Sequence, residues 1–269
     1  MATIPPLTSN LTFLGTSTSV GVPVIGCDCS VCQSSHPRNK RTRSSLYLKS
    51  AGHHILFDTG PDLREQALRE NLHQIDHVFF THDHVDHVTG FDELRAFCWH
   101  REDALPLHAS AHTLATLERM FPWAFGNTAQ NYVRPDPRSF EDCEAIPLGG
   151  GLSITPFPVI HAASPTHGFL IVLPSKERIA YIPDVKTVPE QSMPLLSGLD
   201  LLIIDALRPE PHHTHMSLQE ALQFSARISP RRTGLTHVTH DLDYEITSAA
   251  LSEDVFLAYD GLSLQFPTL

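Results

Sequence analysis

Short apolar runs separated by turn-forming residues dominate the first half of the chain and predict β-strands. The strands are expected at residues 11–14, 46–50, 54–58 and 77–81. Apolar residues at helical spacing predict helices at residues 62–70, 91–99 and 111–120. The segment from Phe121 to Pro137 lacks either pattern, so it is a lid or a plain connection, and we favour the plain connection.

The second half of the chain repeats this character. Strands are predicted at residues 152–159, 169–173, 179–182 and 201–205, and helices at residues 218–228 and about 244–251. Runs of strands with attached helices favour an α/β architecture in which two mixed sheets pack face to face with helices outside. At 269 residues the chain is near the upper size for one hydrophobic core, so we expect residues 1–269 to form a single domain.

A run of metal-binding residue types follows directly after the apolar part of the strand predicted at residues 77–81. The run reads His82-Asp83-His84-Val85-Asp86-His87. Alternation along an extended chain points His82 and His84 to the same side, where two imidazoles can share one ion. Asp86 and His87 follow at once and offer a carboxylate and an imidazole to a second ion. The spacing therefore predicts two adjacent metal sites.

The same run resembles the signature of the metallo-β-lactamase superfamily, and the resemblance covers nearly the whole chain. It implies the fold of that superfamily, an αββα four-layer sandwich, and further metal ligands at strand ends downstream. His161 matches the third ligand of the first metal, Asp184 the carboxylate that bridges both metals, and His237 the last ligand of the second metal. The expected ligand set is therefore His82, His84, Asp86, His87, His161, Asp184 and His237.

Two of these assignments have alternatives nearby. His167 follows His161 by six residues but directly precedes Gly168 and another strand, so His161 is favoured. Asp205 also ends an apolar strand and competes with Asp184, although the Pro-rich stretch after it is more typical of a substrate loop. Asp58 resembles the superfamily's aspartate that orients the metal-binding loops, because imidazole ligands need carboxylates to fix them; the alternative is a simple first-turn helix residue.

A separate cysteine cluster precedes the histidine-rich run. Cys27, Cys29 and Cys32 lie within six residues, a spacing that suits three corners of a tetrahedral zinc site better than a disulfide framework. His240 follows His237 by three residues, so one imidazole can face the catalytic centre while the next turns toward the cysteines. We expect a structural Zn²⁺ on a loop at about residues 26–33. A closed site of this kind has no open position, so we assign it to stability.

The pairing of the two clusters resembles a narrower group within the superfamily, the phosphoribosyl 1,2-cyclic phosphate phosphodiesterases of the PhnP type. The supporting stretches are residues 14–23, the cysteine cluster, residues 38–45 and residues 237–244. This resemblance implies a phosphodiesterase that uses two divalent ions to hydrolyse a small, cyclic, phosphoribosyl-type phosphodiester. Mn²⁺ or Zn²⁺ suits such a mixed imidazole and carboxylate site.

Two divalent ions can lower the pKa of a bridging water and hold it as the attacking hydroxide. The leaving group still needs a proton, and His215, in its Thr-His-Met-Ser context, resembles the general acid of the phosphodiesterase branches. His215 and Asp86 are thus the expected catalytic residues. Arg43 belongs to a basic run at residues 38–43 that is either a solvated face or a contact to the substrate's phosphate groups.

The amino-acid composition limits the classes of substrate and partner that the protein can be expected to bind. With 19 Lys+Arg residues against 30 Asp+Glu residues, the formal net charge of −11 opposes binding of a long polyanion, so a small phosphorylated substrate is favoured over nucleic acid. The 18 histidines suit metal binding and proton transfer. The sequence has neither a basic leader nor about 18 continuous apolar residues, which predicts a cytoplasmic protein without a membrane partner. A homodimer is a reasonable expectation.

Other functions remain open on the same fold. The tRNA 3′-processing endonuclease shares the histidine-rich run, but it binds a large polyanion. A thioester hydrolase or β-lactamase would use the same ions for acyl transfer, although the cysteine cluster and His215 favour a phosphodiesterase. A di-iron oxidoreductase would be expected to place Glu where His84 stands. A zinc protein without catalysis would not need the complete set of catalytic ligands.

Overall fold

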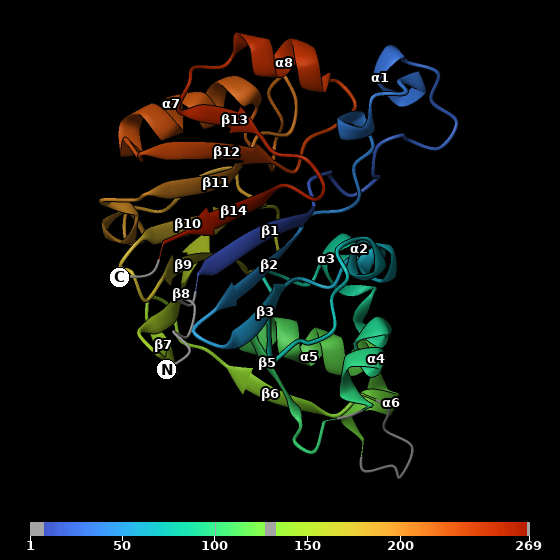
Figure 1. The fold of residues 1–269 in the computed structure, drawn as a ribbon, viewed down its shortest axis with the longest axis vertical. Helices are drawn as coiled ribbons and strands as arrows, with labels where there is room; N and C mark the ends of the chain where they lie inside the picture. Colours follow the sequence, from blue (N-terminus) through green and yellow to red (C-terminus); the bar gives the residue numbers. More distant parts are fainter. Residues whose placement is uncertain (1–7, 100, 127–132, 268–269) are drawn as a thin grey trace, which may run out of the picture.

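Two seven-stranded sheets form the centre of the molecule (Figure 1). The computed structural model describes residues 8–99, 101–126 and 133–267. The first sheet contains β1 (Ser9–Gly15), β2 (Ser45–Ser50), β3 (His53–Phe57), β4 (His77–Phe79), β5 (Leu105–Ala109), β6 (Pro135–Ser139) and β14 (Ser263–Phe266). The second contains β7 (Ile146–Gly149), β8 (Leu152–Val159), β9 (Thr166–Val172), β10 (Arg178–Ile182), β11 (Leu201–Asp205), β12 (Arg232–Thr236) and β13 (Val255–Leu257).

Each sheet is antiparallel on one side and parallel on the other. In the order β14-β1-β2-β3-β4-β5-β6, the pairs up to β3 are antiparallel and those from β3 to β6 are parallel. The second sheet is antiparallel from β7 to β10 and parallel from β10 to β13. Parallel strands end at the same edge of their sheet, so the residues that follow β3 and β4, and those that follow β10, β11 and β12, gather at common edges.

Helices lie on the outer sides of the sheets (Figure 1). On the first sheet these are α2 (Leu63–Arg69), α3 (Val85–Val88), α4 (Arg95–Cys98), α5 (Ala111–Met120) and α6 (Pro122–Phe125), and on the second α7 (Leu218–Ile228) and α8 (Tyr244–Ala250). The short α1 (Ser30–Gln33) belongs to the N-terminal loop. This arrangement confirms the predicted α/β architecture of two mixed sheets. Within the described residues, no helix is long and apolar enough to cross a membrane.

The apolar residues of β10 and β11 alternate between two cores. Tyr181 and Ile203 belong to the core shared by both sheets, where Phe57 packs against Tyr181 with ring centroids 5.7 Å apart. Ile182 and Ile204 belong to the second core, which the sheet forms with its outer helices. Strands buried on both faces read as continuous apolar runs, which is why these strands were predictable from the sequence.

Two predicted segments differ from the structure. The helix expected at residues 91–99 is a 3₁₀ turn, Phe91–Leu94, followed by the single turn of α4. The connection from Phe121 to Pro137 contains α6 and the start of β6, and its residues 127–132 lie outside the described residues. The prolines of β6 hid this strand, yet an edge strand tolerates proline because one of its sides makes no ladder.

Candidate metal centre

Strand ends from both sheets deliver the candidate ligands. After β4, Thr81 leads into His82 and His84, and the first turn of α3 carries Asp86 and His87. His161 follows β8 by two residues, Asp184 follows β10 by two, and His237 directly follows β12. Packing the two sheets face to face therefore brings residues together that lie more than 150 positions apart in the sequence.

The first group consists of His82, His84 and His161, whose nearest ligand atoms all lie within 4.8 Å of one another. His161 Nε2 is 3.3 Å from His84 Nδ1. The other ring nitrogen of His161 contacts the carbonyl of Thr214 at 2.8 Å, and His82 Nδ1 contacts Thr81 Oγ1 at 2.9 Å. These outer contacts fix both rings so that the Nε2 atoms face inward.

The second group consists of Asp86, His87 and His237, and Asp184 lies between the two groups. Asp184 Oδ2 is 3.0 Å from His87 Nε2, and its Oδ1 is 3.2 Å from His237 Nε2 and 3.7 Å from His161 Nε2. Asp86 Oδ2 is 3.4 Å from His87 Nε2. The carboxylate of Asp184 therefore lies within 3.7 Å of ring nitrogens from both groups, the position that a bridging ligand requires.

Asp58 contacts the outer side of the centre and fixes Thr81 and His87 there. Its carboxylate accepts the backbone N–H of Thr81 at 2.8 Å and the Thr81 hydroxyl, and it contacts His87 Nδ1 at 2.8 Å. Asp58 has a φ of 61° and is fully buried. A buried carboxylate on Nδ1 fixes the His87 ring and leaves Nε2 for the centre. The structure thus places Asp58 in the orienting position that the resemblance implied.

The electrostatics of the centre favour a cation. Burial lowers the pKa of His87, but Asp184, Asp86 and Asp58 outweigh it and raise this pKa well above its usual value. Burial lowers the pKa of His161 to about 4. The carboxylates therefore favour positive charge beside His87, which a bound cation would supply in place of the proton, while His161 stays neutral and able to bind metal.

Buried ligand atoms without partners show that these residues fit divalent ions. Within the described residues, His82 Nε2, His87 Nε2, His237 Nε2 and Asp184 Oδ2 are buried and make no hydrogen bond of normal geometry, although His87 and His237 lie 3.0 and 3.2 Å from the oxygens of Asp184. Buried polar atoms are normally satisfied, and these four converge on one place. Imidazole nitrogens and carboxylate oxygens suit Zn²⁺, Mn²⁺ and related ions. The residues present can hold two such ions.

A cavity of about 540 Å³ opens above the centre, and His215 lies in its wall. His215 Nδ1 is 2.7 Å from Asp205 Oδ2, and the ring stacks on His237 with centroids 5.0 Å apart. With Nδ1 bound to Asp205, Nε2 is the nitrogen left to face the cavity. The arrangement can therefore hold a proton at Nε2 beside whatever occupies the cavity.

The two alternative ligand candidates, His167 and Asp205, lie elsewhere in the structure. His167 points elsewhere, with its Nε2 2.9 Å from Asp142. Asp205 contacts His215 and the backbone N–H of Val185, so it lies behind the centre instead of between the two groups. Asp184 and His161 are the residues that occupy the favoured positions.

The cysteine cluster forms a second, separate group. The sulfurs of Cys27, Cys29 and Cys32 lie 3.2, 3.5 and 3.3 Å from His240 Nδ1. The backbone N–H of Cys32 donates to the Cys29 sulfur and lowers the pKa of Cys29 to about 7, which favours the thiolate that binds metal. Four ligand atoms within 4.8 Å of one another fit a single tetrahedral ion.

Comparisons with known proteins agree with this geometry. The family model for the beta-lactamase superfamily domain matches residues 53–238. The crystal structure of a diphosphatase from the PhnP family has 38% sequence identity and a TM-score of 0.88, covering 97% of this chain and 98% of that chain. The chain belongs to the PhnP family of the beta-lactamase superfamily. It has the metallo-β-lactamase fold and carries histidine and aspartate clusters that could hold metal ions, and the predicted resemblance is confirmed.

Curated relatives of this PhnP-family protein are longer. The octanoyltransferase of Porphyromonas gingivalis is 32% identical over 93% of this chain, and the chain spans 50% of that protein. The ribonuclease Z of Bradyrhizobium diazoefficiens is 30% identical over 65% of this chain and 52% of its own length. The chain thus spans about half the length of these relatives.

Sequence reasoning missed two contacts of the PhnP-family site. Asp205 was weighed only as a ligand, whereas it contacts His215. Asp83, inside the histidine-rich run, accepts hydrogen bonds from Thr116 at 2.9 Å and from Ser164, and lies 3.1 Å from His112. Both contacts join residues far apart in the sequence, so no local pattern indicates them.

Arg43 lies beside the metal cavity of the PhnP-family protein and not in its wall. Its Nη1 is 3.1 Å from Asp62, and its Nε donates to the carbonyl of Ser19 at 3.1 Å. Ser19 lines the metal cavity, whereas Arg43 lines a neighbouring cavity of about 480 Å³ together with Lys40 and Arg69. A role of Arg43 in substrate binding stays a prediction.

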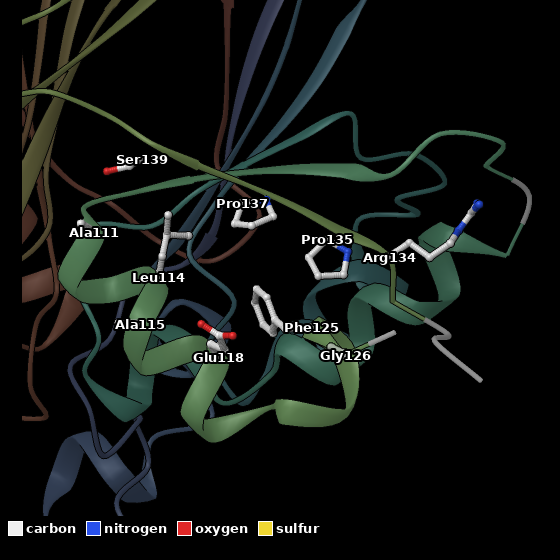
Figure 2. A pocket seen from close by; sticks show the side chains of 11 residues that line it. Ala111, Leu114, Ala115, Glu118, Phe125, Gly126, Arg134, Pro135, Pro137 and Ser139 are labelled. Atoms are coloured by element: carbon white, nitrogen blue, oxygen red, sulfur yellow. The ribbon is translucent and has the colours of Figure 1, made fainter. Parts of the chain in front are cut away.

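Another cavity, of about 510 Å³, lies between α5, α6 and β6. Figure 2 shows Leu114 and Glu118 of α5 on one side, Pro135 and Pro137 on the other, and the ring of Phe125 between them. Its wall contains none of the side chains of either metal-type cluster. This cavity therefore lies apart from both candidate metal sites.

Proposed function

We propose that the protein is a dinuclear-metal-dependent phosphodiesterase that hydrolyses a small phosphodiester, of the cyclic phosphoribosyl type. His82, His84 and His161 would hold one ion, Asp86, His87 and His237 the other, and Asp184 both. The convergence of buried ligand atoms without normal hydrogen bonds below one open cavity is the observation that carries this proposal. When bound, two divalent ions would supply an activated water and stabilise charge on the phosphate oxygens.

The protein's own contribution to the reaction lies in His215. It faces the cavity next to His237, and Asp205 fixes its orientation through Nδ1. A proton at Nε2 can pass to the leaving oxygen of an alkyl phosphodiester, whose alkoxide is otherwise a poor leaving group. His215 would thus act as general acid, with Asp205 as its positioning residue.

A small substrate fits the site better than a long one. A cavity of about 540 Å³ is in the range of small-molecule sites, and the net charge of −11 repels a polyanion. Mn²⁺ in the catalytic pair and Zn²⁺ at the cysteines complete the proposal, since thiolates select zinc and mixed imidazole and carboxylate ligands accept manganese.

A second candidate substrate is a diphosphate, because the PhnP-family structure with 38% identity is that of a diphosphatase. The same centre could cleave the anhydride bond of a diphosphate. Its leaving group is a phosphate, which needs a proton far less than a sugar alkoxide does. The dependence on His215 therefore separates the two substrate classes.

Hydrolysis assays with purified protein loaded with Mn²⁺ or Zn²⁺ test the proposal. The substrates are a ribose cyclic phosphate, a sugar diphosphate and bis(p-nitrophenyl) phosphate, with Asp184→Ala as the control variant. Metal- and Asp184-dependent activity that favours the cyclic phosphate supports the proposal. Preference for the diphosphate selects the second candidate. Inactivity on all three substrates, or cleavage of a precursor tRNA in their place, would contradict both.

A further inference from the structure

The two metal-type clusters are joined by one short loop. His237 belongs to the histidine and aspartate centre, and His240, three residues later, belongs to the cysteine cluster. Its Nδ1 lies 3.2 to 3.5 Å from the three cysteine sulfurs. A displacement of His240 must therefore be taken up by Val238 and Thr239, the two residues that separate it from His237.

The backbone of His237 is in a conformation that its surroundings must enforce. Its φ is 56°, in the left-handed region that non-glycine residues adopt only when the structure around them demands it. On one side His237 is anchored by β12, where Thr236 pairs with Asp205. On the other side the anchor is Val238, so the ring position of His237 depends on what holds Val238.

Val238 is held by the segment that leads into the cysteine loop. Its N–H donates to the carbonyl of Thr16 at 3.0 Å, and its carbonyl accepts the N–H of Thr18 and the hydroxyl of Ser17, both at 3.3 Å. Residues 16–18 lie nine to eleven positions before Cys27, the first residue of the cysteine cluster. The segment that precedes the cysteine loop is therefore bonded to the neighbour of His237.

The segment that leaves the cysteine loop holds the same region. Arg41 is buried, and its guanidinium donates to the carbonyl of Thr239 at 3.2 Å and to that of Leu242 at 2.8 Å. Asn39 adds a bond to Asp243 at 2.7 Å. Figure 1 shows α1 and α8 at the same end of the molecule, although they lie more than 200 residues apart in the sequence.

We propose that the ion held by Cys27, Cys29, Cys32 and His240 positions His237 and thereby sets the affinity of the second catalytic metal site. The cysteine site then does more than stabilise the fold, because its occupancy sets how tightly the second catalytic ion is bound. His240 is a positioning residue in this account. The inference rests on the ligand roles in the proposed function but not on the identity of the substrate.

The first test is Cys29→Ser, with Cys143→Ser as the matched control, since Cys143 is exposed and outside the cluster. Circular dichroism and melting establish folding, elemental analysis gives the metal content, and calorimetry gives the Mn²⁺ affinities. We expect C29S to lose the thiolate-bound ion and to bind the second Mn²⁺ about 10-fold more weakly, while C143S matches the wild type. A folded C29S protein with both Mn²⁺ affinities unchanged would overturn the proposal.

The second test changes the histidine and aspartate centre and measures ion binding at the cysteine cluster. Because it leaves the cysteines intact, it tests the coupling even where C29S does not fold. Coupling between two sites is reciprocal. Asp86→Asn should weaken the second Mn²⁺ site, and the thiolate-to-Co²⁺ absorption should then show about 10-fold weaker Co²⁺ binding at the cysteines than in the wild type. Unchanged Co²⁺ binding despite weakened Mn²⁺ binding would refute the coupling alone. Unchanged Mn²⁺ binding would refute the ligand set as well.

Discussion

The cysteine cluster takes three of its four side chains from one six-residue segment, whereas the histidine and aspartate centre takes its side chains from strand ends in both sheets. The first is partly exposed and close to the surface; Asp184, His87 and His237 in the second are almost completely buried. A cluster of the first kind depends on one loop and a single distant side chain, His240, whereas a cluster of the second kind depends on the packing of the entire sandwich. The difference predicts how each responds to substitution.

The largest effect is expected at the bridge between the two groups. Asp184→Ala removes the carboxylate that lies near His87 and His237 of one group and His161 of the other. We expect kcat/KM to fall roughly 10³-fold because charge stabilisation at the reacting phosphate is lost. The cysteine site should keep its zinc, as measured by elemental analysis. Asp103→Ala, an exposed aspartate, is the control, and equal activity of the two variants would contradict a bridging role.

The next effect separates proton transfer from metal binding. His215→Ala should lower kcat about 10²-fold for a cyclic sugar phosphate, because the alkoxide then leaves without a proton. The loss should be much smaller for bis(p-nitrophenyl) phosphate, which has a good leaving group, and metal content should not change. Asp205→Asn should show the same substrate dependence more weakly, since it only disturbs the orientation of His215. Equal losses on both substrates would exclude a general acid.

A smaller effect, on metal affinity, is expected for Asp58, which contacts the outer nitrogen of His87. Asp58→Asn weakens the bond that fixes the His87 ring and leaves every ligand in place. We expect metal affinity to fall about 10-fold, with activity recovered when Mn²⁺ is in excess. Titration of activity against free Mn²⁺ measures this shift. Activity that stays low at saturating Mn²⁺ would mean that Asp58 does more than orient a ligand.

The smallest effect is expected at Arg43, whose guanidinium is already paired with Asp62. Arg43→Ala should raise KM for a phosphorylated sugar by no more than about 5-fold and should leave kcat unchanged, as partly exposed ion pairs contribute little. Arg64→Ala, also a surface arginine, should change neither constant. If R43A and R64A behave alike, Arg43 has no part in substrate binding.

Both clusters were predictable from the sequence because their candidate ligands are closely spaced or directly follow a recognisable strand. The spacing of His82, His84 and His87 is local, and the downstream ligands each follow an apolar strand whose β-character is clear from composition. Central strands such as β11 are apolar up to their last residue because both faces are covered. The fold class and the candidate ligands could therefore be predicted together.

What could not be predicted arises from contacts between distant segments and from edge strands. The bond from Asp205 to His215 depends on how a loop folds back over the end of β11. Strand β6 carries prolines at positions 135 and 137, which argue against a strand except at an edge. Strands β7, β13 and β14 are three or four residues long, too short for alternation to be distinguished from chance.

Strand β14 has a consequence for the order of events during synthesis. It pairs antiparallel with β1, so the last strand of the chain forms the outermost edge of the sheet that the first strand begins. A nascent chain that has emerged as far as Asp260 already contains every residue of both clusters, yet β1 still presents an open edge. Open strand edges invite pairing with other chains. On the ribosome, the metal-binding residues thus become available before the first sheet can be completed.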